Sequence, residues 1–200
     1  MKRVLRVVAC YVFAATVALS VPITFTITGT ATGTLGSTSF NNASFTVMSL
    51  ADTSLVSLVG SIYTVTATSS SISIAGQPVA TFTDPTYWSD PQGAGDIIFG
   101  DLIRNPGLFP GILGITVLFQ GLESYNLQSS FGPIFSPLDF PSSIFHTFAN
   151  IPTSQGALSL VASNETFTAS VPEPTCIVPL FLAFTTFAAV RRSTSSKARG

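Results

Sequence analysis

The sequence has little that could support metal, redox or nucleophilic chemistry. Its 200 residues include only two Cys and one His. Both cysteines, Cys10 and Cys176, lie in apolar terminal segments, so the middle of the chain has no thiol and no internal disulfide. A zinc site built from His and Cys is therefore excluded, and the middle of the chain has to be held together by its core.

Charge is also scarce, because charged residues make up only 8% of the chain. Seven of the eight basic residues lie near one of the two termini, and Arg104 is the only cation between residues 21 and 171. Eight carboxylates less this one cation leave that region with a net charge of about −7. Since it cannot neutralise phosphates, nucleic acid binding is excluded. The acidity favours solubility and is compatible with cation binding.

The N-terminus has the pattern of a secretory signal peptide. Lys2, Arg3 and Arg6 precede an uncharged stretch over residues 7–19, which is too short to span a bilayer comfortably. Ala18 and Ser20 are small residues at the two positions that a signal peptidase recognises before its cleavage site. We therefore predict a signal peptide over residues 1–20, with cleavage after Ser20.

The C-terminus combines a proline motif, an apolar run and a basic end. Val171, Pro172, Glu173 and Pro174 precede an uncharged run over residues 175–190, which Arg191 and Arg192 close. As a helix the run would be about 24 Å long, a minimal span for a hydrocarbon core of about 30 Å. The arginines place this end and the tail, residues 193–200, on the cytoplasmic side. The prolines keep the motif extended and exposed.

This order of features resembles the PEP-CTERM sorting signal of bacterial exported proteins, over residues 171–192. The resemblance implies that an exosortase-type membrane protease recognises the signal and that the protein goes to the cell surface or an exopolysaccharide matrix. An ordinary single-span membrane anchor is the alternative interpretation. The sorting residues by this resemblance are Val171, Pro172, Glu173, Pro174, Arg191 and Arg192.

The middle of the chain shows the period of β-strands. Every even position from 24 to 34 is Thr, apolar residues occupy most of the odd ones, and similar alternation recurs at 63–68, 71–74, 80–83 and 166–169. Turn residues at 29, 33, 41–42, 60, 76–78 and 84–85 predict short strands between them. We predict an all-β domain over residues 21–170, an antiparallel sandwich or jelly roll of eight to twelve strands. Longer loops are expected in residues 84–143.

The rows of Thr and Ser have more than one interpretation. They are typical of β-strands whose solvent-exposed face carries no charge. They could also be sites of O-glycosylation, or form a flat array that binds ice or a polysaccharide.

Residues 84–101 hold the strongest candidate for a ligand site. The segment concentrates four carboxylates, the aromatic residues Tyr87 and Trp88, and several turn residues. Its oxygen ligands would suit Ca²⁺, and Tyr87 or Trp88 could stack on a sugar ring. Against this, the spacing does not fit an EF-hand, and Asp before Pro is ordinary turn chemistry. The candidate ligand-binding residues are Asp84, Tyr87, Trp88, Asp90, Asp96 and Asp101.

Catalysis has little support in the sequence. His146 is the only histidine available for a Ser-His-Asp triad, and no G-x-S-x-G motif is present. We therefore expect no catalytic residues and no cofactor, and bound Ca²⁺ is kept only as an alternative. The sequence predicts an exported surface or matrix protein with a structural or adhesive role. The alternatives are a carbohydrate-, calcium- or ice-binding module and, less well supported, a secreted hydrolase that uses two carboxylates or His146.

Overall fold

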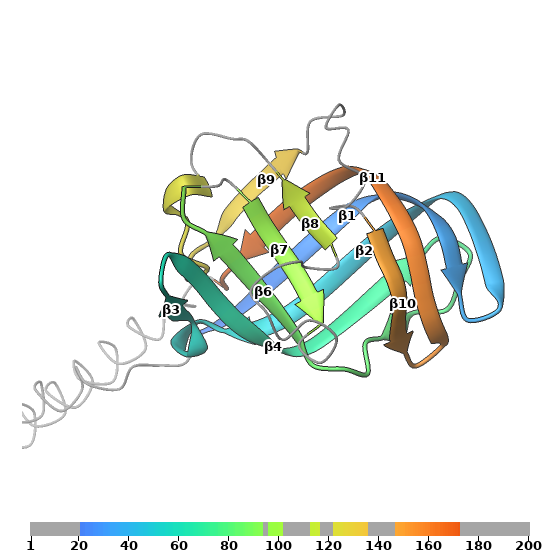
Figure 1. Ribbon diagram of the computed structural model, residues 1–200, viewed down its shortest axis with the longest axis horizontal. Coiled ribbons are helices and arrows are strands. Elements are labelled where there is room, and N and C mark those ends of the chain that lie inside the picture. Colours follow the sequence, from blue (N-terminus) through green and yellow to red (C-terminus); the bar gives the residue numbers. More distant parts are fainter. Residues whose placement is uncertain (1–20, 94–95, 102–112, 117–121, 136–146, 173–200) are drawn as a thin grey trace, which may run out of the picture.

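The computed structural model describes residues 21–93, 96–101, 113–116, 122–135 and 147–172 (Figure 1). The predicted signal peptide, Arg104 and His146 lie outside these residues. So does the predicted sorting signal from Glu173 onward, with its apolar run over residues 175–190. Within the described part of the chain, no helix has the length and apolar character needed to cross a membrane.

Four long strands form the body of the domain, and each follows the alternation seen in the sequence. They are β1 (Pro22–Leu35), β2 (Thr38–Asp52), β4 (Ile62–Ile74) and β11 (Gly156–Ser170). On β1 the odd residues Ile23, Phe25 and Ile27 are fully buried, while the even threonines point outward. Because the side-chain period of a strand is two, this pattern places the whole apolar set on one face.

Shorter elements complete a single antiparallel sheet that curls over on itself (Figure 1). Its strand order is β10-β11-β1-β2-β4-β6-β7-β8, with β3 and β5 paired to β4 and β9 paired to β11. The all-β antiparallel prediction is confirmed. The shorter elements are η1 (Thr53–Leu55), β3 (Ser57–Val59), β5 (Ala80–Thr81), β6 (Thr86–Pro91), β7 (Asp96–Asp101), β8 (Leu113–Thr116), η2 (Leu122–Ser124), β9 (Phe131–Phe135) and β10 (Thr147–Thr153).

The curl lets two layers of the sheet bury their apolar faces against each other. Strand β4 belongs to both layers, because its second half pairs with β2 and its first half pairs with β6. The ring of Phe25 on β1 stacks on Trp88 of β6 with 4.9 Å between centroids. Phe99 of β7 and Phe167 of β11 lie 5.0 Å and 5.7 Å from the same indole. This aromatic cluster, drawn from both layers, is the centre of the core.

The prediction of short strands between turn residues was wrong for β1 and β2. Gly29 and Gly33 lie inside β1 rather than at its end, and Asn42 lies inside β2 with φ of 47°. A Cβ atom at Gly33 would overlap the carbonyl oxygen of Ser159 on the neighbouring strand. Glycine there permits close strand approach and does not mark a turn. The positive φ of Asn42 accompanies a register shift between β1 and β2, as in a β-bulge.

Both ends of the described domain lie at the same side of the molecule. Pro22 is opposite Asp52, and Thr24 is opposite Ser170, so β1 begins where β11 ends. We call this side, defined by Val21 and Pro172, the terminal end. The turns of the β1-β2 and β10-β11 hairpins form the distal end, where the amide of Gly36 donates to the carbonyl of Ala157. The 14 residues of β1 separate the two ends by roughly 45 Å.

Candidate functional site

The aromatic residues predicted to bind a ligand lie inside the protein. Trp88 is fully buried, and its ring contacts Phe25, Phe99 and Phe167. Tyr87 is 5% exposed, and its ring lies over Gly100 of the neighbouring strand. All six residues of β6 are buried, because both of its faces are covered. Neither Tyr87 nor Trp88 therefore presents an open ring face to a sugar.

The four carboxylates of this segment do not gather at one place, because they are divided between the two ends of β6 and β7. Asp101 lies opposite Thr86 at one end of β6, while Asp90 lies opposite Tyr63 near the other end. Four residues of strand, about 13 Å, separate these two positions. That is more than the separation of about 5–9.5 Å between paired carboxyl groups in glycosidases. Asp84 lies in the loop before β6, and Asp96 is at the far end of β7 from Asp101.

Two buried tyrosines lie near these carboxylates. Burial raises the pKa of Tyr87, and the charge of Asp101 raises it further. Burial also raises the pKa of Tyr125, with a smaller contribution from the charge of Asp90. The hydroxyl of Tyr125 donates to the carbonyl of Ser129 at 2.9 Å. Both tyrosines are therefore neutral at neutral pH and do not act as general bases.

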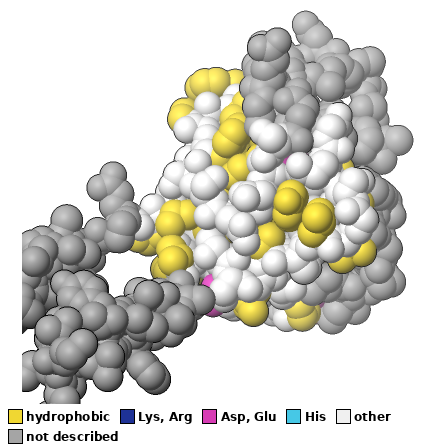
Figure 2. Space-filling view, turned by 90° about the vertical axis from the view of Figure 1, so that its left-hand side faces the viewer, with side chains coloured by type: hydrophobic (Ala, Val, Ile, Leu, Met, Phe, Trp, Pro, Cys, Tyr) yellow, Lys and Arg dark blue, Asp and Glu magenta, His cyan; other side chains and the backbone are white. Residues whose placement is uncertain are grey.

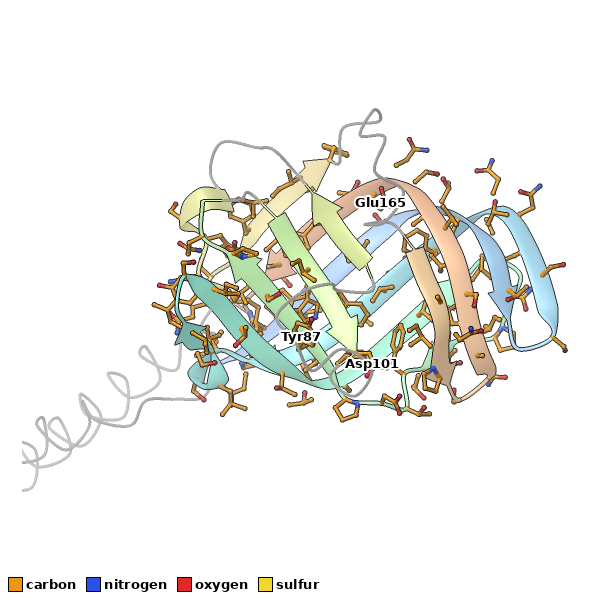
Figure 3. The ribbon with its side chains drawn as sticks, in the orientation of Figure 1. Tyr87, Asp101 and Glu165 are labelled. Carbon is orange, nitrogen blue, oxygen red and sulfur yellow. The ribbon has the colours of Figure 1, made fainter. Side chains whose placement is uncertain are left out.

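Glu165 is a buried carboxylate that the sequence did not single out. It is 2% exposed and lies on β11 next to a register shift, close to Gly29 of β1. Figure 3 shows it apart from Tyr87 and Asp101, which lie near each other at one end of β6 and β7. Within the described ranges, His, Cys, Asp and Glu form no group of three or more that could hold a metal ion.

The outward face of the four long strands is lined with hydroxyl groups. Thr24, Thr26, Thr28 and Thr30 point outward from β1, and each is opposite one residue of β11 and one of β2. Three of the β2 residues are in turn opposite serines of β4. We call this surface the hydroxyl face. Its rows, from β11 to β4, are Ser170, Thr24, Leu50 and Ser69; Thr168, Thr26, Met48 and Ser71; Thr166, Thr28, Thr46 and Ser73; and Ser163, Thr30 and Ser44.

The hydroxyl face is a regular, uncharged array. The strands that carry the hydroxyls lie about 4.8 Å apart, and residues on the same face of a strand are about 6.7 Å apart. Each hydroxyl can donate one hydrogen bond and accept others. The buried carboxylates Asp90, Asp101 and Glu165 are 0–2% exposed and do not contribute to it. Two apolar side chains interrupt the array, Met48 at 50% and Leu50 at 42% exposure.

A shallow depression continues this surface toward the distal end. Its volume is about 370 Å³, and its lining includes Thr32 and Thr34 of β1 with Ser159 and Val161 of β11. The side chains are again hydroxylated or apolar and carry no charge. Over its described residues, the outward surface can therefore form hydrogen bonds and apolar contacts over a long stretch.

The sequence indicated only part of the hydroxyl face. Alternation in residues 24–34 predicted the threonines of β1, but the serines at 69, 71 and 73 gain significance only through the register of β4 against β2. Of the predicted sorting residues, Val171 and Pro172 are described at the terminal end, and Glu173, Pro174, Arg191 and Arg192 lie outside the described residues. No family model, curated protein or solved structure matches this chain.

Proposed function

We propose that this chain is an exported bacterial surface or matrix protein, anchored and then processed at its C-terminal signal, with an adhesive rather than catalytic role. The observation that carries the proposal is that both ends of the domain lie at the terminal end. A domain attached there extends its hydroxyl face outward over roughly 45 Å of strand. The enzymes that would process the chain during export are signal peptidase and an exosortase-type protease.

The sorting part of the proposal is tested by changing Glu173, the single charged residue of the motif. The measurement is intact mass and cell fractionation in the native host for the wild type and Glu173→Ala. The wild type should lack residues 1–20 and the region beyond the motif, while the variant should remain full length from about Val21 and membrane-bound. Ser170→Ala, an exposed change three residues away, is the matched control. Identical processing of Glu173→Ala and wild type would falsify the sorting signal and favour a plain anchor.

For the adhesive role, we propose that the hydroxyl face binds a neutral polysaccharide. An uncharged array of donors and acceptors matches the hydroxyls of a neutral polymer, and Met48 and Leu50 offer apolar area to sugar rings. The acidic domain would repel an anionic polymer. The same array, now seen to extend over four strands, also favours ice as a second candidate ligand.

Co-sedimentation with insoluble cellulose, alginate gel and growing ice compares these ligands directly. We expect binding to cellulose but not to alginate. Thr26→Val and Thr28→Val together should weaken binding at least fivefold, because they remove hydroxyls while keeping β-branched shape. Thr66→Val, an exposed change on β4 outside the hydroxyl face, should leave binding unchanged. Unchanged binding in the double variant would exclude the face, and retention on ice alone would replace the polysaccharide with ice.

A further inference from the structure

Three exposed apolar side chains lie on η1 and β3 at the terminal end of the domain, with Leu58 and Val59 on opposite faces of the projecting β3-β4 ribbon. Leu55 of η1 is 59% exposed, and Leu58 and Val59 of β3 are 54% and 52% exposed. Val56 between them is partly buried against the core, so the outward apolar area comes from the other three. Strand β3 pairs with β4 alone among the described strands. Figure 2 looks toward this end and shows hydrophobic side chains at the surface there. We call Leu55, Leu58 and Val59 the terminal patch.

The terminal patch lies beside the points where the chain enters and leaves the domain. The amide of Thr53, which begins η1, donates to the carbonyl of Val21 at 3.0 Å. On the C-terminal side, the amide of Val171 donates to Ser130 Oγ at 2.9 Å. Gln128 Nε2 donates to the carbonyl of Thr53 at 3.4 Å, which links the segment before β9 to η1. The patch and both chain ends therefore occupy one side of the molecule.

The chain beyond Pro172 is too short to hold this side far from a membrane. The apolar run begins at residue 175, three residues after Pro172. Three residues span at most about 10 Å when fully extended. Pro172 and Pro174 restrict the connection further. A chain anchored through residues 175–190 must then keep its terminal end at the level of the lipid headgroups.

We propose that the terminal patch inserts into the surface of the bilayer while the chain is anchored, an inference that rests on the anchoring proposed above. Leucine and valine side chains partition into the boundary between headgroups and acyl chains. The described residues contain no Lys or Arg, and Asp52 lies next to η1, so the contact is hydrophobic and independent of anionic lipid. Patch and anchor together orient the domain with its distal end outward. They also hold the motif around Glu173 at the depth where a membrane-embedded protease works.

The test places a polarity-sensitive NBD label at the patch and at a matched distal site. The chain from Val21 onward, without the predicted signal peptide and with Cys176 changed to alanine, carries Leu58→Cys or Val161→Cys, whose native residues are 54% and 55% exposed. Each protein is reconstituted into phosphatidylcholine vesicles. One vesicle set contains a nitroxide lipid that quenches from the membrane, and iodide quenches from water. Flotation of the vesicles reports anchoring independently of the labels.

We expect the label at position 58 to lose at least half of its fluorescence to nitroxide lipid and to be at least threefold less accessible to iodide than the label at 161. Adding Leu55→Ser and Val59→Ser should restore iodide quenching at position 58. A chain that floats with equal quenching of both labels overturns the bilayer contact and leaves the anchor intact. Protection from iodide without nitroxide quenching overturns it in favour of a protein contact. A chain that does not float overturns the anchor, and the contact with it.

Discussion

The ring of Tyr87 on β6 lies across Gly100, its cross-strand partner on β7. A Cβ atom at Gly100 would come within 2.5 Å of Tyr87 Cε1 and 2.7 Å of its hydroxyl oxygen. The aromatic ring covers the strand position that has no side chain of its own. This pair fills the outer side of the β6-β7 hairpin, whose inner side contacts the aromatic core.

Gly100→Ala should destabilise the domain by about 1–3 kcal/mol, because the added methyl group overlaps a buried ring. Urea unfolding measures the change. Tyr87→Ala combined with Gly100→Ala should cost less than the sum of the two single changes, since the smaller side chain removes the overlap. Strict additivity would show that the ring does not occupy this position.

Trp88→Ala should lower the free energy of unfolding by about 3–5 kcal/mol, as expected for truncation of a large, fully buried aromatic side chain. Thermal and urea unfolding test this, with the exposed change Leu58→Ala expected to stay within about 0.5 kcal/mol of the wild type. A folded Trp88→Ala protein of normal stability that had lost sugar binding would instead support the stacking role considered from the sequence.

Ser70 connects two other buried hydroxyls across three strands. Its Oγ donates to Ser49 Oγ at 2.7 Å and lies 2.6 Å from Thr86 Oγ1. Ser70→Ala should destabilise the domain by about 1–3 kcal/mol, because it leaves two buried polar groups without this partner. The triple change Ser49→Ala, Ser70→Ala and Thr86→Val should be less destabilising than Ser70→Ala alone when measured by urea unfolding. The opposite order would show that the hydroxyls act independently.

The stability of the domain should fall as the pH rises above about 10. Between residues 21 and 172 the chain has no Lys or Cys, so the tyrosines there titrate without interference from those groups. The folded-state pKa of Tyr125 is raised above that of the unfolded chain, which is near 10. The unfolded state therefore loses its proton first, and the stabilisation present below pH 10 is lost as the pH rises beyond it. Urea midpoints from pH 8 to 11.5 should show a shallower decline for Tyr125→Phe, and an equal decline would contradict the assignment.

The alternation of polar and apolar residues predicted those strands that have one solvent-exposed face and one buried face. Residues 24–34 alternate because their threonines face water and their odd residues face the core. Strand β6 gave no such signal, since both of its faces are buried and Trp88 and Asp90 share one of them with Thr86. Its polar composition looked like an exposed loop. The register between distant strands could not be predicted from the sequence. This register places Asp90 and Asp101 apart, and it places Thr28 and Ser73 in one row of the hydroxyl face.

The distal end is also where the sheet joins back to itself. Strand β5 pairs with β4, while the amide of Ser154 donates to the carbonyl of Thr81 and Phe82 bridges to Thr153 at the end of β10. Backbone groups that would otherwise form an open sheet edge are thereby occupied. Exposed edges recruit strands from neighbouring chains and lead to aggregation. At this end, the occupied backbone groups leave a neighbouring copy of the chain fewer places to add a strand.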